Sequence, residues 1–258
     1  MSKQLIHGLH SIEAALLNSG REDFEIFVTD DSLKAIKNKL GKAYDWSRVK
    51  INLHSNDLLQ SKAQKYFSDN DFRQQRISTN IFLLCNSLEK KDTNDLLKKI
   101  DKKEIKKIIV LDNITDVQNA AAILRTCAFY AVDAVIVSTK QEIELNPSFA
   151  KIASGAIEFV PIFYVSSLVK IIDILEERNF SCFALTEHAE EKEKINFNSN
   201  TLKAFFLGSE DKGLSHAILR KIKFKIRLVP LGKISTLNVH AAATVVMDRY
   251  FSKDLDLS

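Results

Sequence analysis

Residues 229–247 read VPLGKISTLNVHAAATVVM, and this stretch departs from the pattern of an ordinary surface helix. It begins like the end of a strand, turns through a proline and a glycine, and is uncharged over its last 14 residues. Small residues on all sides of a helix let other backbones approach closely, so we expect burial or packing against a partner subunit. The polar cluster before the helix can cap it or bind a polar ligand. This cluster consists of Ser235, Thr236 and Asn238.

Length and composition indicate a globular protein with one large or two modest domains. The chain has 258 residues, of which 45% are hydrophobic and 27% charged, and a net charge of +4, which says little about partners. Cys85, Cys127 and Cys182 are odd in number and match no CxxC or zinc spacing, which favours a reducing compartment. No signal core occurs, and no apolar run approaches the roughly 18 residues of a membrane span. We therefore expect a soluble cytoplasmic protein with no membrane and no metal partner.

The first 87 residues alternate between helix and strand patterns and form a small α/β unit large enough for its own core. Helices are expected at 7–20, 32–44 and 58–67, and strands at 24–30, 49–55 and 81–88. The composition then becomes dense in charge at 89–107, which suits a linker with one amphipathic helix. We therefore predict an N-terminal domain at 1–87, a linker at 88–106 and a second domain at 107–258.

The second domain reads as repeated strand–helix units. Apolar strands are expected at 108–113, 131–139, 160–165, 181–187 and 203–210, with helices at 117–130, around 149–156 and at 167–179. This alternation predicts an α/β fold with a mostly parallel sheet and helices on both faces. Ligands of such sheets bind beyond the carboxyl ends of the strands, so the polar residues there are the candidates.

The first candidate stretch is LDNITDVQNAAAILRTCAF at 111–129. It places Asn119 and Arg125 six residues apart on one helix, near its opening. Arg125 is surrounded by alanine, isoleucine, leucine, cysteine and phenylalanine. It is either a surface charge with a buried stem or a cation that has a partner or a ligand.

The second candidate stretch is FFLGSEDKGLS at 205–215. Two of the seven glycines, Gly208 and Gly213, flank Glu210 directly after an apolar strand, so backbone groups can approach a bound molecule closely. The alternative is a plain connection with Ser215 as the N-cap of the next helix. No GxGxxG or Walker pattern occurs, which argues against a dinucleotide or nucleoside triphosphate site. The three stretches supply groups for positioning and hydrogen bonding, without a Ser–His pair or metal ligands.

Three segments, DVQNAAAILR, LGSEDKGLS and VPLGKISTLNVH, resemble in order the motifs of the SpoU (TrmH-type) RNA 2′-O-ribose methyltransferases. The family motifs read Asp-Pro-x-Asn-x-Gly-Ala-x-x-Arg, Gly-x-Glu-x-x-Gly and a proline segment ending in Ser-Leu-Asn-Val-Ser. The match covers 108–250, and GLHSIEAAL is similar to the opening of the family's N-terminal domain. Three motifs in order make a specific signal.

The resemblance implies a C-terminal trefoil-knotted, mostly parallel sheet of the SPOUT type and a smaller N-terminal α/β domain resembling ribosomal protein L30e, which binds RNA. It also implies the cofactor S-adenosylmethionine, bound in a pocket made by the knot. The family is homodimeric, with the site completed near the two-fold interface. This agrees with the small-residue helix at 238–247.

By the same resemblance, the active-site positions converge on one pocket, where Arg125 activates the hydroxyl or grips the adjacent phosphate. These positions are Asn119, Arg125, Glu210, Thr236 and Asn238. The cofactor would be held mainly by backbone groups of Gly208, Val229, Leu231 and Leu237.

Several positions depart from the family pattern. Val117 replaces a proline, Ala121 a glycine, and His240 the last serine, while Thr236 keeps the hydroxyl of the usual serine. The family's His-Gln-Gly segment is RQQR at 73–76, which bears on the choice of RNA more than on methyl transfer.

Basic residues suggest where RNA binds. RKIKFKIR at 220–227 is expected to place Lys221, Lys223, Lys225 and Arg227 on one face of a strand, opposite three apolar residues. Such a strip contacts phosphates, or else it protects a solvated edge strand. We expect RNA contacts at Arg73, Arg76, Lys223 and Lys225.

The resulting hypothesis is an S-adenosylmethionine-dependent RNA 2′-O-methyltransferase that acts on structured RNA. A guanosine of 23S ribosomal RNA is the favoured target, because an RNA-binding domain precedes the catalytic unit. The alternatives are a tRNA 2′-O-methyltransferase and a non-catalytic RNA-binding or ribosome-assembly protein that keeps the fold.

Overall fold

The computed structural model describes residues 3–141, 143–187, 189 and 202–251, and the chain forms two compact units. Unit 1 comprises Met1–Glu89 together with Glu144–Glu158, and unit 2 comprises Lys90–Ile143 together with Phe159–Ser258. The chain therefore passes from one unit to the other three times. Within the described residues, no helix combines the length and apolarity needed to cross a membrane.

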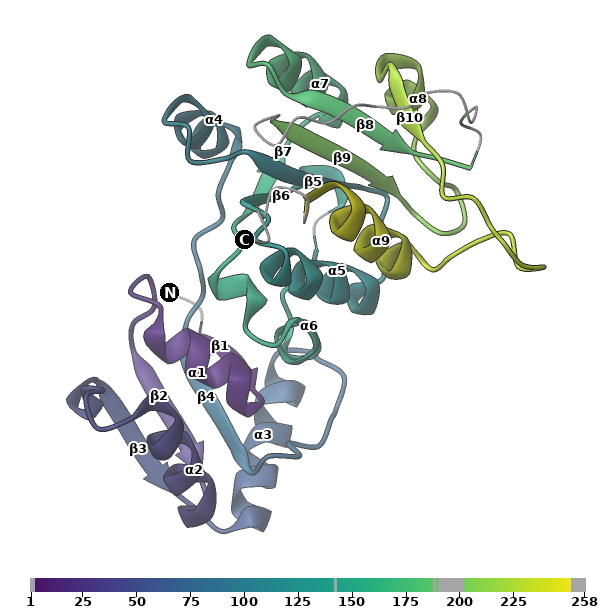
Figure 1. The fold of residues 1–258 in the computed structure, drawn as a ribbon. Coiled ribbons are helices and arrows are strands. Elements are labelled where there is room, and N and C mark those ends of the chain that lie inside the picture. Colours follow the sequence, from purple (N-terminus) through teal and green to yellow (C-terminus); the bar gives the residue numbers. More distant parts are fainter. Residues whose placement is uncertain (1–2, 142, 188, 190–201, 252–258) are drawn as a thin grey trace, which may run out of the picture. The chain divides into compact units, whose positions relative to one another are not determined.

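Unit 1 contains a four-stranded sheet with helices on both faces (Figure 1). The strand order is β1 (Lys3–His7), β4 (Ile81–Asn86), β2 (Phe24–Val28) and β3 (Val49–Leu53), and only the β2–β3 pair is parallel. Alternate strand residues pack against α1 (Leu9–Leu17) and α2 (Asp30–Leu40) on one face, and against α3 (Asn56–Asp69) on the other. The strand β1 was not predicted from the sequence.

The segment 144–158 follows β6 in the chain but packs in unit 1. It forms α6 (Pro147–Ala153) and the 3₁₀ turn η3 (Ala156–Glu158). The Ser11 hydroxyl donates to the Ala150 carbonyl at 2.8 Å. Gly155 has φ of +88°, and a Cβ there would lie 2.7 Å from the Ala14 Cβ, so only glycine allows this approach to α1.

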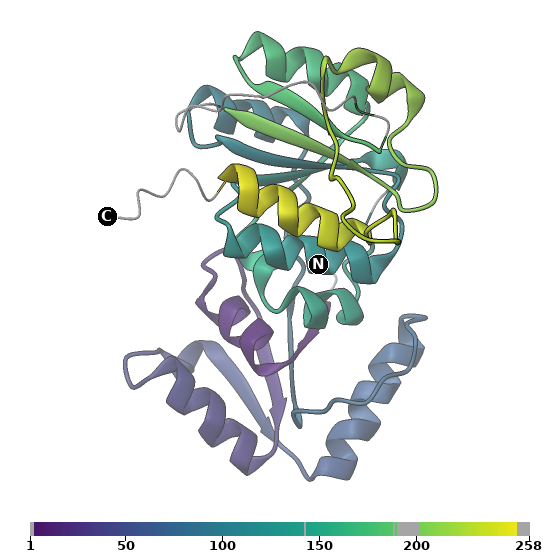
Figure 2. The same ribbon diagram turned by 45° about the vertical axis from the view of Figure 1, so that its right-hand side comes forward.

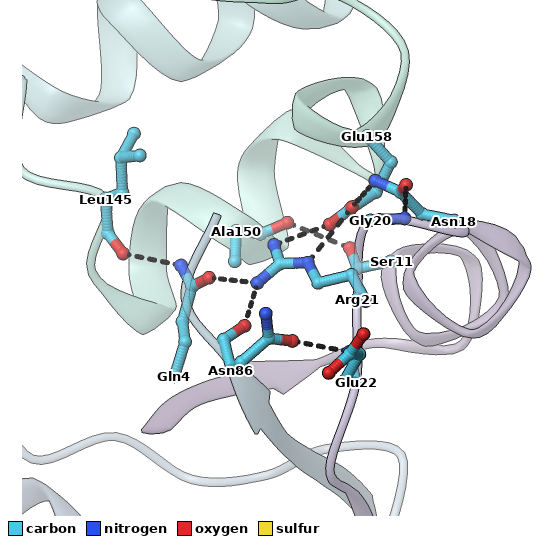
Figure 3. A network of polar contacts seen from close by, with 10 residues as sticks. All are labelled: Gln4, Ser11, Asn18, Gly20, Arg21, Glu22, Asn86, Leu145, Ala150 and Glu158. Carbon is cyan, nitrogen blue, oxygen red and sulfur yellow. Dashed lines mark hydrogen bonds and ion pairs between the residues drawn. The ribbon is translucent and has the colours of Figure 1, made fainter. Parts of the chain in front are cut away.

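A buried ion pair holds the end of this segment (Figure 3). The Arg21 side chain is 0% exposed and that of Glu158 is 1% exposed. The guanidinium donates to both carboxylate oxygens, from Nη2 to Oε1 at 2.7 Å and from Nε to Oε2 at 3.1 Å. Its Nη1 donates to Gln4 Oε1 and to the Asn86 carbonyl, while Asn18 donates to Glu158 Oε2. Protein groups alone thus provide partners for both charges, and buried charges require such partners.

Unit 2 contains a parallel six-stranded sheet, which confirms the predicted α/β class. The strands lie in the order β10 (Phe224–Ile226), β8 (Ser181–Leu185), β9 (Lys203–Gly208), β5 (Lys107–Asp112), β6 (Ala134–Ser138) and β7 (Ile162–Val165). The helices α5 (Val117–Phe129) and α9 (Val239–Phe251) lie side by side on one face (Figure 2). On the other face lie α4 (Thr93–Asp101), α7 (Leu168–Glu177) and α8 (His216–Lys221).

The structure groups some residues differently from the predicted domain division. The expected amphipathic helix exists as α4, but Leu96 and Ile100 are buried in the core of unit 2, so this part of the predicted linker is integral to that unit. The segment 144–158, which was assigned to the second domain, belongs to unit 1. Sequence patterns identify helices and strands but not the core against which a short helix packs.

The predicted basic strand at 220–227 is wrong in its extent. The helix α8 continues to Lys221, whose ammonium pairs with Asp173 at 2.5 Å, and β10 begins only at Phe224. The four cations therefore do not share one strand face. Phe224, which was expected on the face opposite the cations, is exposed.

We expect Glu158→Ala to lower the free energy of unfolding of unit 1 by about 3–5 kcal/mol, because it leaves the Arg21 guanidinium buried without a counter-charge. Trp46 is the only tryptophan of the chain and lies in unit 1, so its fluorescence during urea unfolding measures this loss. Asp31→Ala is the matched control within unit 1, since it removes an exposed pair with Lys34 and should cost about 1 kcal/mol or less. Equal losses in the two variants would contradict the expectation.

Candidate functional site

The glycine loop after β9 is held at the carboxyl edge of the sheet by a buried carboxylate. Asp112, the last residue of β5, accepts the Ser215 N–H at 2.7 Å through Oδ2. Within the loop, the Gly213 N–H donates to the Ser209 carbonyl at 2.8 Å. A Cβ on Gly208 would lie 2.1 Å from the Gly213 carbonyl carbon. Glycine at 208 is therefore required by the fold of the loop itself.

A cavity of about 610 Å³ opens beside this loop. Its walls come from the end of β8 at 185–187, the loop at 207–214, the stretch at 228–237 and the first turns of α9. Predicted cofactor residues that line it are Gly208, Val229, Leu231 and Leu237. The cavity thus joins the second and third candidate stretches, both of which begin at strand ends.

Asn238 connects the three candidate stretches through its side chain. As the residue before α9, it accepts the His240 N–H at 2.9 Å through Oδ1. Because Oδ1 must face this donor, Nδ2 is the atom that donates to Asn119 Oδ1 at 3.0 Å and to Glu210 Oε2 at 3.3 Å. The cap therefore sets the orientation of the whole trio.

The trio leaves one donor and one acceptor available to a ligand. Asn119 uses Oδ1 to accept from Asn238, and within the described chain its Nδ2 has no protein acceptor. Glu210 uses Oε2, and its Oε1 has no protein donor among the same residues. An amide N–H and a carboxylate oxygen together supply what a hydroxyl group needs, since a hydroxyl accepts one hydrogen bond and donates another.

The first turn of α5 orients Asn119. Asp116 caps this helix by accepting the N–H groups of Gln118 at 2.6 Å and of Asn119 at 2.9 Å. Neither Asp116 nor Asp112 was predicted from the sequence as a site residue. The N-cap rule could have identified Asp116, and the position of Asp112 at the end of a buried apolar run could have identified it as well.

Only part of the predicted convergence is present in one copy of the chain. Thr236 and Glu210 line the cavity. Asn238 forms hydrogen bonds with both Asn119 and Glu210. Arg125 is absent from the described cavity lining. It is exposed on α5 and has neither an ion pair nor a hydrogen bond to any described residue. Six residues of helix turn it about 120° away from Asn119, which explains the separation.

His240, which stands where the family has serine, connects α9 to α5. The Thr126 hydroxyl lies 3.1 Å from the Ala122 carbonyl and 3.0 Å from His240 Nε2. Because the hydroxyl donates its proton to the carbonyl, it accepts from Nε2–H of the imidazole. This departure from the motif therefore contributes to the packing of the two helices.

The predicted RNA-contacting residues are exposed in both units. In unit 1, Arg73 and Arg76 project from the loop after α3. The Gln60 side chain anchors this loop by bonding both the N–H and the carbonyl of Ile77, at 3.1 and 2.8 Å. In unit 2, Lys223 and Lys225 are exposed at the edge strand β10.

Cysteine chemistry does not contribute to this site. Cys85, Cys127 and Cys182 are buried free thiols. Burial raises the pKa of Cys85 to about 11 and that of Cys182 to about 12, and it raises the pKa of Cys127 as well. Thiols in such surroundings stay protonated at neutral pH and are poor nucleophiles.

Comparison with known sequences identifies relatives over most of the chain. A protein of Staphylococcus aureus assigned to the TrmH family tRNA/rRNA methyltransferases is 33% identical over 167 residues, which cover 64% of this chain and 67% of the relative. A protein of Staphylococcus epidermidis with the same assignment is 28% identical over 254 residues, or 98% and 97% of the two chains.

Solved structures share the fold. The SpoU methyltransferase AviRb from Streptomyces viridochromogenes, in complex with the cofactor AdoMet, matches with a TM-score of 0.72 at 18% identity, over 95% of this chain and 88% of that one. The AdoMet-bound rRNA methyltransferase from Sinorhizobium meliloti matches with a TM-score of 0.70 at 15% identity, over 99% and 88%. The family model described as the SpoU rRNA Methylase family matches residues 106–248. The chain therefore belongs to the SpoU rRNA Methylase family.

Proposed function

We propose that this protein transfers a methyl group from S-adenosylmethionine to a ribose 2′-hydroxyl of structured RNA, with a guanosine of 23S ribosomal RNA as the favoured target. The observation that carries the proposal is the trio of Asn119, Glu210 and Asn238 beside the cavity, because it offers the donor and acceptor that a hydroxyl needs. Family membership supplies the reaction class, RNA methylation.

The cavity is the proposed site of S-adenosylmethionine, which supplies an electrophilic methyl group on a cationic sulfonium. Two observations support the fit. Gly208 presents bare backbone to the cavity, where a side chain would collide with the loop. The wall also carries the carboxylates of Glu187 and Glu210, which favour a cation. The relatives AviRb and the Sinorhizobium meliloti enzyme are both solved with AdoMet.

The chain's own residues orient the attacking hydroxyl. Asn119 Nδ2 donates a hydrogen bond to the oxygen of the ribose hydroxyl, and the Glu210 carboxylate accepts a hydrogen bond from its O–H. A lone pair of the oxygen is then free to attack the methyl carbon. With S-adenosylmethionine bound, the cofactor would supply the methyl group and leave as S-adenosylhomocysteine, and the hydroxyl proton would pass to the Glu210 carboxylate or to water. Arg125 binds the adjacent phosphate and stabilises negative charge on the oxygen without giving up a proton.

Arg125 is proposed to serve the cavity of a second copy in a homodimer. No residue of α5 lines the cavity, and the Arg125 side chain has no ion pair with any described residue, and both observations support a partner outside its own chain. The nearby Phe129 is 81% exposed, beside the small residues of α5 and α9, as expected of a surface that is covered by another subunit. A trefoil knot in unit 2, RNA binding by unit 1 and a cytoplasmic location complete the proposal.

The function is tested by incubating the protein with methyl-labelled S-adenosylmethionine and ribosomal RNA from cells that lack it. We expect label in dinucleotides that resist alkali, because alkaline cleavage of RNA needs a free 2′-hydroxyl. Arg125→Ala should reduce incorporation by about 100-fold or more while leaving cofactor affinity unchanged. Label found only in mononucleotides would mean base methylation and would refute the proposed reaction. Transfer RNA in the same assay identifies the competing substrate.

The cofactor site is tested by two alanine substitutions at glycines of the same cavity region. Gly208→Ala should weaken S-adenosylmethionine binding by about tenfold or more in calorimetry, since the added carbon displaces the loop. Gly232→Ala is the matched control, because nothing lies within 4 Å of its added carbon. Circular dichroism checks that both variants fold. Similar affinities in the two folded variants would place the cofactor elsewhere.

Sharing of sites between subunits is tested by mixing the Arg125→Ala and Gly208→Ala variants after partial unfolding and refolding together. If Arg125 acts across the interface, each mixed dimer contains one complete site, and random mixing restores about one quarter of the native activity. If Arg125 acts within its own chain, no complete site forms and the mixture stays as inactive as its components. Refolded native protein provides the reference activity.

A further inference from the structure

A basic and aromatic surface in unit 1 lies apart from the residues predicted to bind RNA. The segment 37–50 carries five basic residues against one acidic residue, so its net charge equals that of the entire chain. It comprises the end of α2, a loop, and the 3₁₀ turn η1 (Trp46–Arg48). The only tryptophan of the protein is at its centre.

Three of the five cations have no carboxylate partner. Lys39 pairs with Glu13 and Lys50 pairs with Glu25, each at 2.8 Å. The others, Lys37, Lys42 and Arg48, are exposed and form no ion pair with any described residue. Cations that are concentrated in one short segment without carboxylate partners cost stability by mutual repulsion, so their presence suggests a polyanion that compensates the charge.

The one carboxylate of the segment is engaged elsewhere. Asp45 accepts the Ser47 N–H at 3.0 Å and the Ser47 hydroxyl at 2.7 Å, which caps η1. These hydrogen bonds, together with the charge of Arg48, lower the pKa of Asp45, so the carboxylate is ionised. One negative charge against five positive charges still leaves the segment with a net charge of +4.

The Trp46 ring is fixed as a platform. The Tyr44 ring meets it edge-on, with ring centroids 5.1 Å apart, and the Tyr44 hydroxyl donates to the Leu16 carbonyl at 3.1 Å. Trp46 also packs against the core of unit 1 and remains partly exposed. The Lys37 ammonium lies 5.4 Å from the ring centroid. A cation at this distance marks a ring face that attracts positive or planar groups.

We propose that this surface, formed by Lys37, Lys42, Trp46 and Arg48, binds single-stranded RNA, with one base stacked on the indole and the neighbouring phosphates bound by the three cations. It rests on the proposed function only in taking RNA as the polymer. Stacking on an aromatic ring within a positive groove is how proteins bind single strands without sequence selection. The segment carries no exposed large aliphatic side chain that would insert into a membrane, so the polyanion is a nucleic acid.

The surface therefore gives unit 1 a second contact with RNA, distinct from the loop that carries Arg73 and Arg76. That loop follows α3, whereas the surface around Trp46 lies at the end of α2 and just after it. These two helices cover opposite faces of the unit 1 sheet. A single RNA segment that contacts both must pass around the edge of the sheet. The preferred substrate is thus a structured RNA with an unpaired flanking strand.

The test uses the intrinsic fluorescence of Trp46 and a twelve-nucleotide oligouridylate as the probe. We expect quenching on binding, because the base stacks on the only indole of the protein. The triple variant Lys37→Glu, Lys42→Glu, Arg48→Glu should bind at least about tenfold more weakly, and the slope of log affinity against log salt should fall by about 2, as three lost phosphate contacts require. Trp46→Phe should retain most of the affinity measured by anisotropy of labelled probe, and Trp46→Ala should lose about 5- to 150-fold.

The charge-matched control is Lys98→Glu, Lys102→Glu, Lys103→Glu, which changes three lysines at α4 of unit 2. It should leave both the quenching and the salt slope close to native. Equal effects of the two triple variants would overturn the inference, as would quenching by anionic phosphatidylserine vesicles but not by the oligonucleotide. If the native protein methylates no RNA but binds the oligonucleotide as expected, the RNA-binding surface is supported and the proposed catalysis is refuted.

Discussion

The side chain of Asn238 is the interaction on which the site depends. One amide caps α9 through its oxygen and joins Asn119 and Glu210 through its nitrogen. These residues come from three segments that lie up to 119 positions apart in sequence. Because the helix cap fixes which end of the amide is the donor, the polarity of the trio is a consequence of secondary structure. A side chain that is free to flip would leave the hydroxyl-binding groups undefined.

The sheet determines where this amide meets its partners. The strands β5 and β9 are parallel neighbours, in a register that places Asp112 opposite Gly208. The loop after β9 therefore begins beside the end of β5, and Asp112 accepts the Ser215 N–H to hold it there. Small residues on α5 and α9 allow these helices to pack side by side over the same sheet face. Backbone proximity, more than side-chain reach, brings the segments together.

Much of unit 2 could be predicted from the sequence because its strands are buried and apolar and its helices are periodic. The glycine loop and the Asn238 cap were accessible for the same reason, since glycine and asparagine have local conformational roles. The position of Arg125 away from the cavity of its own chain was not predicted, although its spacing from Asn119 was visible in the sequence. The order of the motifs assigned Asn119 and Arg125 to the same pocket, whereas the geometry of the helix directs their side chains about 120° apart.

The predicted domain boundaries were limited by a different cause. The segment 144–158 contains ordinary helix-forming residues between two strands of unit 2, and nothing in its composition shows that it packs in unit 1. The information lies in pairs of distant residues, such as Arg21 with Glu158 and Ala14 with Gly155. Each member of such a pair looks ordinary in sequence: an arginine after a helix, a glycine in a turn. The charged stretch at 89–107 was similarly interpreted from its surface lysines, whereas three of its residues, Leu96, Ile100 and Ile105, are buried in the core of unit 2.

The placement of 144–158 also sets the order of events while the chain is being synthesised. Domains usually fold as soon as their residues leave the ribosome. The four strands of unit 1 are complete once Asn86 has emerged, but the Arg21 guanidinium then lacks its counter-charge. It acquires that partner only after Glu158 has been added, by which time β5 and β6 of the other unit are already translated. Unit 1 can therefore be completed only after part of unit 2 has been translated, because its last segment follows β6 in the sequence.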